Sequence, residues 1–416
     1  MPSVSYGSVP FPQQIDFIRQ KLNIPTRHWT DIYTQEHDWA FMVAGANRDA
    51  IVGDFRESIE RMIADGGTLE EFRKDFDNIV AKHGWDYNGG RNWRSRVIYE
   101  TNLFSSYNAG RFEQLWNDRD ILPYWQYHHN DSVTHPREHH LAWDGLILRA
   151  DNLWWKAHFP PGGWGCQCYV TGLSEYDIQQ QQLKLGDAPA ENWQTVEIGQ
   201  RSPSGPRTVR VPEGIDPGFE YTPGRARLQS AIPPERPEPP TSGSTGGQGL
   251  PNTRPNAPLP EPRPANPDQL LREGLTQEEY ARAFLQPFGA DLDSPVVFRD
   301  VIDERLVMGK DLFTDRRTGA LKADKRGRGR YLPLLAEAVI DPDEIWVRLE
   351  WHHAQKKAIV RRRYIAQFSL PNQILPALAV FEIGADGWSG ITVFQPDAHD
   401  IDDMRVGVRL YSRDEE

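Results

Sequence analysis

Apolar residues recur at intervals of three and four along the first quarter of the chain, a spacing that places side chains on one face of an α-helix. The first stripe comprises Phe41, Val43, Ala44, Ile51, Phe55, Ile59, Met62 and Ile63. An Asp-Gly-Gly turn ends it, and Thr68 begins a second helix as N-cap, with Glu71 completing a capping box, up to Gly84. A third stripe covers 93–116, so the sequence predicts an all-helical platform over residues 11–116.

Beyond this platform the pattern changes to short strands and turns. Residues 122–169 hold many aromatic side chains between turn residues. Segments 195–198 and 208–211 flank a Ser-Pro-Ser-Gly-Pro turn, which predicts a hairpin with a longer loop. The sequence therefore predicts a mainly α amino-terminal domain with a small, aromatic-rich β part.

The last third of the chain begins with helical patterns and continues with strand patterns. Helices are expected at 276–285 and 331–338. Five strand segments follow, at 344–349, 357–368, 377–382, 390–394 and 405–411. Helices followed by a run of strands predict an α+β domain with an antiparallel sheet.

A tract rich in Pro, Gly and Ser separates these two parts, over residues 232–267. Such a tract buries little apolar surface, and its prolines lack backbone donors, so an extended and mobile tether is expected. The predicted organisation is a first domain over 1–231, a linker over 232–267 and a second domain over 268–416.

Composition and charge narrow the function. Hydrophobic residues make up 38% of the chain, with 14 Trp, 14 Tyr and 17 Phe, which favours packed domains. The net charge of -12 argues against a protein that coats nucleic acid with its whole surface, but a local basic site remains compatible. No stretch approaches the roughly 18 apolar residues of a membrane-spanning helix. The amino terminus lacks the basic head and apolar run of a Sec-type signal, so synthesis in the cytoplasm is expected.

The two cysteines of the chain, Cys166 and Cys168, lie one residue apart, downstream of a histidine cluster. Zinc prefers imidazole and thiolate ligands in structural sites, so His135, His139, Cys166 and Cys168 are candidate zinc ligands. A proline directly after His135 would start a short helix that leaves His139 or His140 free to turn inward. Because the Cys-x-Cys spacing is tighter than usual, a tight aromatic turn with two buried thiols is the alternative.

Several short blocks in this part occur in an order that resembles the phage Mu F type head morphogenesis protein, also called the minor head protein. They are RSRVIYETNLFSSYNAGR at 94–111, DSVTH at 131–135, PPGGWGCQC at 160–168 and GIDPGFEYTPG at 214–224. The resemblance covers about residues 11–224. It implies a structural role in prohead assembly near the portal, with few copies per virion. Many members carry paired cysteines where this chain has His135 and His139, which strengthens the zinc hypothesis.

Two basic runs, at 316–330 and 356–363, concentrate positive charge in the last third and suit a phosphate backbone. A solvated loop and a charge-protected edge strand are the alternative. In segment 405–411, a period of two sends Val406, Val408 and Leu410 to the core. The same period predicts that Arg405, Arg409 and Tyr411 lie together on the other face.

Such a face would suit a metal-independent ribonuclease. Cations stabilise the charged phosphorane, a hydroxyl fixes the phosphate, and an acid or base serves the 2'-hydroxyl and the leaving oxygen. The candidate catalytic residues are Arg363, Tyr364, Thr392, Arg405 and Tyr411. His352 and His353 are further candidates for a general base, because imidazole titrates near neutrality.

Segment 335–411, with its blocks LAEAVIDPDEIWV, RRRYIAQF, ALAVFEI, WSGITVF and MRVGVRLY, resembles the phage-borne barnase, EndoU, colicin and RelE-like nucleases. The resemblance covers about residues 275–411. It implies an endoribonuclease that needs no metal, acts on RNA such as tRNA, and leaves a cyclic phosphate end.

The favoured interpretation is a virion protein of the phage head with two parts. The first assembles with the portal and other capsid proteins, and the second is an RNase-like effector on a tether. One alternative is a purely structural virion protein whose second domain only binds portal, scaffold or nucleic acid. Another is a bacterial polymorphic toxin with a phage-type trafficking domain.

Overall fold

The structure is a computed structural model, and the chain falls into two compact units. The first holds the described residues between 11 and 230, apart from Ile24–Arg27 and Asn47–Ala50, which group with the second. The second also holds the described residues from 258 onward. The structure describes residues 11–133, 135–202, 205–230, 258–266, 268, 270–315, 318–324, 328–353, 355–370, 376–384, 387–394, 401 and 404–415.

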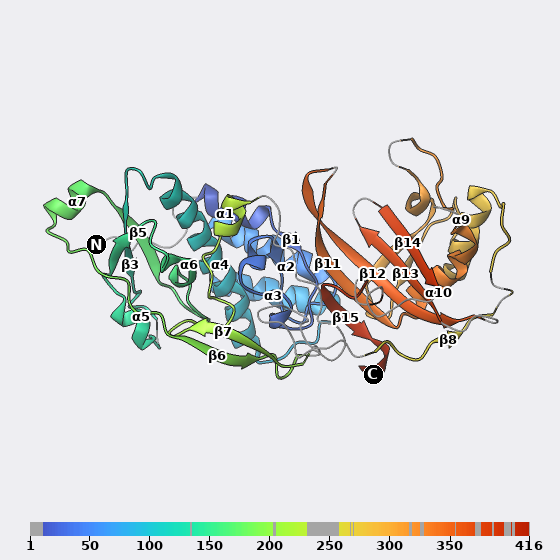
Figure 1. The fold of residues 1–416 in the computed structure, drawn as a ribbon, viewed down its shortest axis with the longest axis horizontal. Helices are drawn as coiled ribbons and strands as arrows, with labels where there is room; N and C mark the ends of the chain where they lie inside the picture. The colour runs from blue at the N-terminus through green and yellow to red at the C-terminus, as the bar shows by residue number, and fades with distance from the viewer. Residues whose placement is uncertain are drawn as a thin grey trace. The chain divides into compact units, whose positions relative to one another are not determined.

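Four helices open the first unit (Figure 1). They are α1 Pro12–Arg19, α2 Asp49–Asp65, α3 Leu69–His83 and α4 Arg91–Asn117. The predicted capping box of α3 is confirmed, because the Thr68 side chain accepts from the backbone N–H of Glu71 and the Glu71 carboxylate accepts from that of Thr68. Gly84 ends α3 in the left-handed conformation, with φ at 57°. None of the described helices has the length and apolar character that crossing a bilayer requires.

The prediction that Phe41, Val43 and Ala44 belong to the first long helix is wrong. Residues Ala40–Phe41 form β2, which pairs in parallel with β1, Leu22–Asn23. Gly45, with φ at 84°, turns the chain before α2 begins. Phe41 and Val43 are buried in the same core as α2, so burial alone reproduced the helical spacing across a turn.

A three-stranded antiparallel sheet, ordered β4-β3-β5, follows α4. Its strands are β3 Tyr124–His128, β4 Ile147–Arg149 and β5 Tyr169–Leu173. The short helices around it are α5 Glu138–Ala142, α6 Trp155–His158, α7 Glu175–Gln180 and α8 Arg225–Gln229. The predicted hairpin is confirmed as β6, Trp193–Ile198, and β7, Arg207–Pro212. The core of this part of the first unit contains Trp125 and Phe159 together with both cysteines.

The second unit is built on one sheet, in the order β14-β13-β12-β11-β15, with β8 paired to β12 off this path. Its strands are β8 Arg263–Pro264, β11 Glu344–His352, β12 Lys357–Ser369, β13 Ala377–Gly384, β14 Gly387–Phe394 and β15 Val408–Ser412. Neighbours along the path are antiparallel, as predicted. The helices are α9, Gln277–Leu285, and α10, Leu332–Ile340. The hairpin of β9, Val296–Arg299, and β10, Arg305–Met308, was not predicted.

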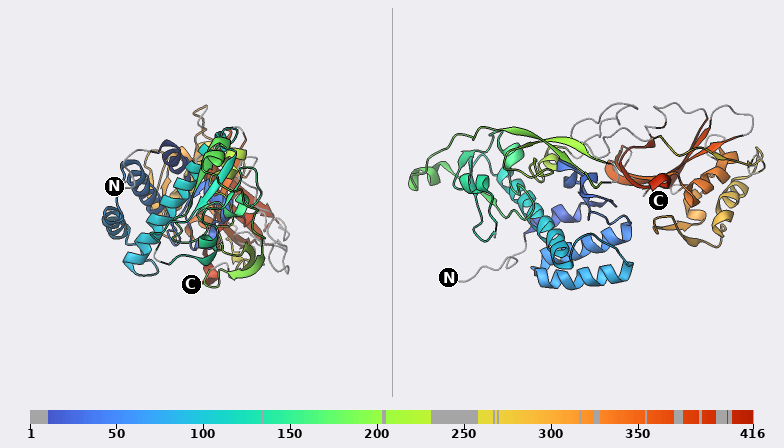
Figure 2. Two further views of the ribbon diagram at one scale, coloured as in Figure 1. Left: turned by 90° about the vertical axis from the view of Figure 1, so that its left-hand side faces the viewer. Right: turned by 90° about the horizontal axis from the view of Figure 1, so that it is seen from below.

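Helices α9 and α10 cover one face of this sheet (Figure 2). Phe284 of α9 stacks on Phe381 at 5.2 Å, and Phe381 is the register partner of Tyr364. Successive side chains of a strand alternate, so Arg361 and Arg363 belong to the opposite face. We call that opposite face the arginine face, and its charged residues are Arg348, Arg361, Arg363, Arg405, Arg409, Glu344, Glu350 and Glu382.

Two predicted boundaries need correction. Of the predicted linker, 232–267, residues 232–257 lie outside the described part of the chain. Near its end, Arg263–Pro264 pairs with Phe368–Ser369 as β8, so the tether does not extend to residue 267. Proline is tolerated there because β8 lies at an edge of the sheet. The last strand begins at Val408 and not at 405, since the backbone of Gly407, with φ at 118°, departs from strand geometry.

Candidate functional site

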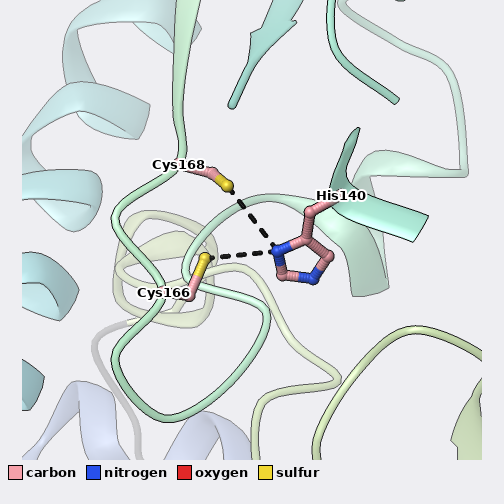
Figure 3. Close-up of side chains that lie close together, drawn as sticks. All are labelled: His140, Cys166 and Cys168. Carbon is pink, nitrogen blue, oxygen red and sulfur yellow. Dashed lines mark hydrogen bonds between the residues drawn. The ribbon is translucent and has the colours of Figure 1, made fainter. Parts of the chain in front are cut away.

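Both cysteines and one histidine of the first unit converge on a single point (Figure 3). His140 Nδ1 lies 3.6 Å from Cys166 Sγ and 3.6 Å from Cys168 Sγ, and the three atoms all lie within 4.8 Å of one another. All three side chains are buried. Two thiols and an imidazole at this spacing form a group that can hold a metal ion.

Helix α4 fixes the segment that carries the cysteines. The Asn108 amide donates to the backbone carbonyl of Cys168 at 3.3 Å, and the Arg111 guanidinium donates to the carbonyl of Val170 at 3.2 Å. Both donors lie in the block 94–111, which is distant in sequence from the cysteines. The helical platform therefore positions the first residues of β5 and the thiols that precede them.

His140 is oriented from the other side of its ring. Its Nε2 lies 3.0 Å from the carbonyl oxygen of Gly214, so this hydrogen bond assigns the proton to Nε2 and leaves the Nδ1 lone pair directed at the sulfurs. The chain passes closely here, since a Cβ at Gly162 would lie 2.9 Å from Ile215 Cδ1 and 3.0 Å from His140 Nε2. Glycine is therefore required in the PPGG turn for the ring to take this place.

The two thiols share one negative charge. Hydrogen bonding from Cys166 lowers the pKa of Cys168 to about 3, and His140 and Tyr127 add to this effect. The same hydrogen bond, together with burial, raises the pKa of Cys166 well above its ordinary value. Burial also raises the pKa of Tyr127, so its phenol stays protonated beside the sulfurs. One thiolate is therefore already favoured, and thiolate is the form that binds metal.

The structure brings His140 to the cysteines, and not the two histidines that the sequence predicted. His135 and His139 are both exposed, and His139 Nε2 lies 3.7 Å from a carboxylate oxygen of Glu213. The helix after His135 begins at Glu138, which turns His139 to solvent and His140 inward. His129, just after β3, was missed, although its Nδ1 lies 3.6 Å from Cys168 Sγ. Its signal in the sequence was only its place at the end of an aromatic strand.

A network of ion pairs occupies the arginine face of the second unit. Arg405 donates two hydrogen bonds of 2.7 Å to the carboxylate of Glu344, which is 1% exposed. Arg409 lies 3.4 Å from the same carboxylate, and Trp346 Nε1 donates to it at 2.7 Å. Arg363 Nε lies 2.5 Å from Glu382. These arginines are buried, yet each has a charged partner.

The network becomes accessible toward the β11–β12 turn. Arg348 and Arg361 are partly exposed, face each other in register, and both pair with Glu350. His352 continues the same face two residues beyond Glu350, and its Nδ1 accepts from the backbone N–H of Gln355 at 3.1 Å. Two exposed lysines, at 356 and 357, complete this end. Positive charge thus predominates at the solvent-facing end of the arginine face.

The structure does not gather the predicted catalytic residues on one exposed surface. Arg405 was expected at the surface and is 2% exposed, while Arg363 is also buried. Tyr364 is fully buried under the helices, where its hydroxyl donates to Asp300 at 2.7 Å. Tyr411 pairs in register with Ile345, on the face of Tyr364. Alternation separates Tyr364 from Arg363, because consecutive strand residues cannot share a face. Tyr411 and Arg409 are two residues apart, and a register shift between Ile345 and Trp346 separates them.

Some of the residues predicted to be functional in this half lie outside the residues that the structure describes. The backbone of Thr392 pairs with Ala379 in β14, and its side chain is not among those described. Of the basic run 316–330, residues 316, 317 and 325–327 lie outside the described part of the chain. In the described part of this run, Lys322 Nζ lies 2.5 Å from a carboxylate oxygen of Asp315, and Arg330 Nη1 lies 3.1 Å from a carboxylate oxygen of Glu273.

Comparison with known families assigns a class to each half. Residues 53–171 match the family of Phage Mu protein F like proteins, and residues 283–412 match the family of phage-Barnase-EndoU-ColicinE5/D-RelE like nucleases. The chain therefore carries a Mu F like domain followed by a nuclease-like domain, and both predicted resemblances are confirmed. The first match contains the cysteine–histidine group, and the second contains the arginine face.

Two curated proteins are similar to this chain. The chain is 31% identical over 243 residues to the putative capsid assembly protein F of Escherichia phage Mu, covering 52% of this chain and 55% of that protein. It is 36% identical over 177 residues to the Mu-like prophage FluMu F protein of Haemophilus influenzae, covering 40% and 42% respectively. The chain thus spans about half the length of the curated relatives that it matches. No solved structure matches it.

Proposed function

We propose that this chain is a minor head protein that acts in phage capsid assembly and resides in the phage head. The similarity to a capsid assembly protein supports this role, and it extends over 52% of the chain. The portal and other capsid proteins are the partners that such a role requires. Synthesis in the host cytoplasm precedes assembly.

We further propose that the second unit is a metal-independent endoribonuclease that cleaves RNA by attack of the 2'-hydroxyl on the adjacent phosphodiester. The observation that carries this proposal is the pair Arg348 and Arg361, which meet in register and are partly exposed on a face otherwise closed by buried ion pairs. Their guanidinium groups suit the developing charge of the phosphorane. Lys356 and Lys357 would hold neighbouring phosphates.

In this proposal His352 supplies the acid–base chemistry. It lies on the same face as the two arginines, and imidazole titrates close to neutral pH. The predicted catalytic residues Arg363 and Arg405 then act as positioning groups, since they are buried and pair with Glu382 and Glu344. Tyr364 and Tyr411 would support the sheet and not touch RNA.

The test uses the full-length chain with total RNA and purified tRNA, with and without EDTA. Cleavage should occur in both conditions and leave a cyclic phosphate. His352→Ala should lower the rate by about 10²–10⁴-fold, the usual contribution of a general acid or base. Arg361→Ala should lower it as strongly, whereas Arg282→Ala, half-exposed on α9 at the other face, should leave it unchanged.

A binding role without cleavage is the second candidate. The observation in its favour is that each of the five arginines of the arginine face pairs with a glutamate, so none is reserved for a reacting phosphate. Under this alternative the correctly folded chain would bind RNA or a capsid partner and leave RNA intact at all enzyme concentrations.

For the first unit, we propose that the group of His140, Cys166 and Cys168 holds a structural zinc ion. Thiolate and imidazole are the ligands of zinc in closed structural sites, and all three side chains are buried among aromatic rings. The ion would join α5 to the segment that leads into β5, a region with little regular hydrogen bonding. Elemental analysis of the purified chain should find one zinc per molecule.

A further inference from the structure

The structure assigns His129 as the fourth ligand of this site, which makes it a complete Cys₂His₂ zinc centre formed by His129, His140, Cys166 and Cys168. This inference rests on the proposed zinc ion and specifies how the ion is closed off from solvent. His129 lies directly after β3, at a point that neither the histidine cluster nor the Cys-x-Cys spacing indicated.

The distances between the side chains carry the argument. Zinc bonds of about 2.3 Å to sulfur and about 2.0–2.1 Å to nitrogen, at the tetrahedral angle, place a sulfur and a nitrogen ligand about 3.6 Å apart. Three such separations occur here, from His140 Nδ1 to each sulfur and from His129 Nδ1 to Cys168 Sγ, and each is 3.6 Å. His140 Nδ1 thus stands at the separation that a shared ion requires from both sulfurs, and His129 Nδ1 stands at it from Cys168 Sγ. The ligand atoms that all lie within 4.8 Å of one another are those of His140, Cys166 and Cys168, so the His129 ring would move closer to the other two ligands when the ion binds.

Simple hydrogen bonding explains this arrangement less well. The Nδ1 atom of a neutral imidazole has one lone pair, so it cannot accept well-directed hydrogen bonds from two thiols at once. Yet His140 Nδ1 is equally distant from Cys166 Sγ and Cys168 Sγ. A cation between the three atoms removes the conflict, because each ligand then directs one lone pair at the same point.

Other histidines near the site are engaged elsewhere. His128 Nε2 lies 2.7 Å from the Thr171 hydroxyl, and its ring stacks on Tyr169 at 4.8 Å. His158 Nδ1 lies 3.0 Å from the Trp154 carbonyl. The pair His128 and His129 therefore divides at the end of β3, where the first faces the sheet and the second faces the sulfurs.

The surroundings of both imidazoles suit a structural centre. His140 Nε2 donates to the Gly214 carbonyl, which is the outer contact that metal-bound histidines commonly make. The backbone N–H of His129 donates to Asp144 Oδ1 at 2.8 Å, and this hydrogen bond holds the backbone of His129 in place. A four-ligand site would thus tie the end of β3 to α5 and to the chain before β5. With four protein ligands, no position remains for substrate, so the centre would be structural and not catalytic.

The experiment measures zinc content and coordination in the full-length chain. Wild-type protein should contain one zinc, and its cobalt-substituted form should give the d–d and thiolate charge-transfer absorption of a tetrahedral site with two sulfurs. His129→Ala should weaken zinc retention against a chelator by more than the about 10–100-fold typical of outer contacts. It should also change the cobalt spectrum. His128→Ala, one residue away, is the matched control and should retain both zinc and spectrum.

The outcomes separate the two proposals. A wild-type chain that folds without zinc, and takes up none when zinc is supplied, overturns the metal site as a whole. A zinc-bearing chain in which His129→Ala leaves affinity and cobalt spectrum as in wild type overturns only the assignment of His129. If His129→Ala fails to fold, His129→Cys keeps a zinc ligand at this position. It should bind cobalt with the charge-transfer absorption of three sulfurs, and a spectrum that keeps the wild-type absorption of two sulfurs would overturn the assignment.

Discussion

Glu344 is the shared counter-charge of two buried arginines on the arginine face. Its carboxylate, 1% exposed, receives two hydrogen bonds from Arg405, one from Trp346 and the charge of Arg409. Glu344→Gln would leave two buried guanidinium groups without a counter-charge, and breaking a buried pair costs about 3–5 kcal/mol. Chemical denaturation should detect this loss in the free energy of unfolding of the second unit.

The matched control is an exposed ion pair of the same unit. Glu273, whose side chain is 81% exposed, pairs with Arg330, and Glu273→Gln should cost less than about 1 kcal/mol. If the two variants proved equally stable, the buried network around Glu344 would contribute no more to stability than an exposed ion pair.

Asp343 should make the stability of the second unit depend on pH. Burial raises the pKa of this carboxyl from its ordinary 3.8 to about 6. The backbone N–H of Gln367 and the guanidinium of Arg413 favour the charged form, but their effect is smaller than that of burial. Between pH of about 4 and about 6 the folded state therefore holds a proton that the unfolded state has lost. Stability from this group is fully present below about pH 4 and is lost as pH rises through about 6.

Asp343→Asn removes that titration. The stability difference between wild type and Asp343→Asn should shift by up to about 3 kcal/mol against the wild type as pH rises from about 4 to about 7. Urea denaturation at several pH values measures it. A difference that stays constant across this range would contradict the raised pKa.

The metal site marks the limit of prediction at the residue scale. The paired cysteines could be recognised because the chain has only two and places them together. The histidines could not, because the ligands depend on which side of a five-residue helix faces inward and on a strand end about 40 residues upstream. Spacing favoured His135 and His139, whereas the inward direction of α5 and β3 favours His140 and His129.

At the scale of elements, β15 depends on the residue that precedes it. Gly407 adopts φ of 118°, and a Cβ there would collide with the carbonyl oxygen of Val347 and lie 2.8 Å from Arg348 Cβ. Gly407→Ala should therefore cost about 2–5 kcal/mol, because backbone strain and overpacking add, and should loosen the pairing of β15 with β11. Equilibrium denaturation and amide exchange in β15 would measure both effects.

Gly274→Ala provides the control for backbone strain alone. Gly274 also has a positive φ, of 78°, and no atom lies within 4 Å of where its Cβ would be. This variant should cost only about 1–2 kcal/mol, the penalty of a left-handed conformation. Equal costs for the two glycines would mean that close packing against β11 is unimportant.

Prediction at this scale succeeded where the signal was local. The capping box at Thr68 and the strand segments at 357–368 and 377–382 are patterns of neighbouring residues, and the helix and the strands that they predict are present. Phe41 was assigned to a helix because a strand and a turn happened to bury residues at helical spacing. Arg405 was assigned to the surface because alternation was applied across Gly407, where the strand had not yet begun.

At the scale of the whole molecule, the two units have separate cores, one of which contains the cysteines and the other the sheet face. Removing zinc should therefore affect them unequally. A strong chelator should lower the melting temperature of the first unit by several degrees, while the transition of the second unit stays in place. Differential scanning calorimetry of the full chain with and without chelator tests this, and a chelator that shifts neither transition would contradict a stabilising metal.

In the proposed function, one chain joins a capsid component to a nuclease-like domain, and both travel in the particle. Mass spectrometry of purified phage particles tests it most directly, by asking which peptides of this chain are present. We expect peptides from both 53–171 and 283–412, in equal copy number, within the head. Particles that contain peptides from the first range and none from the second, or from neither, would contradict it.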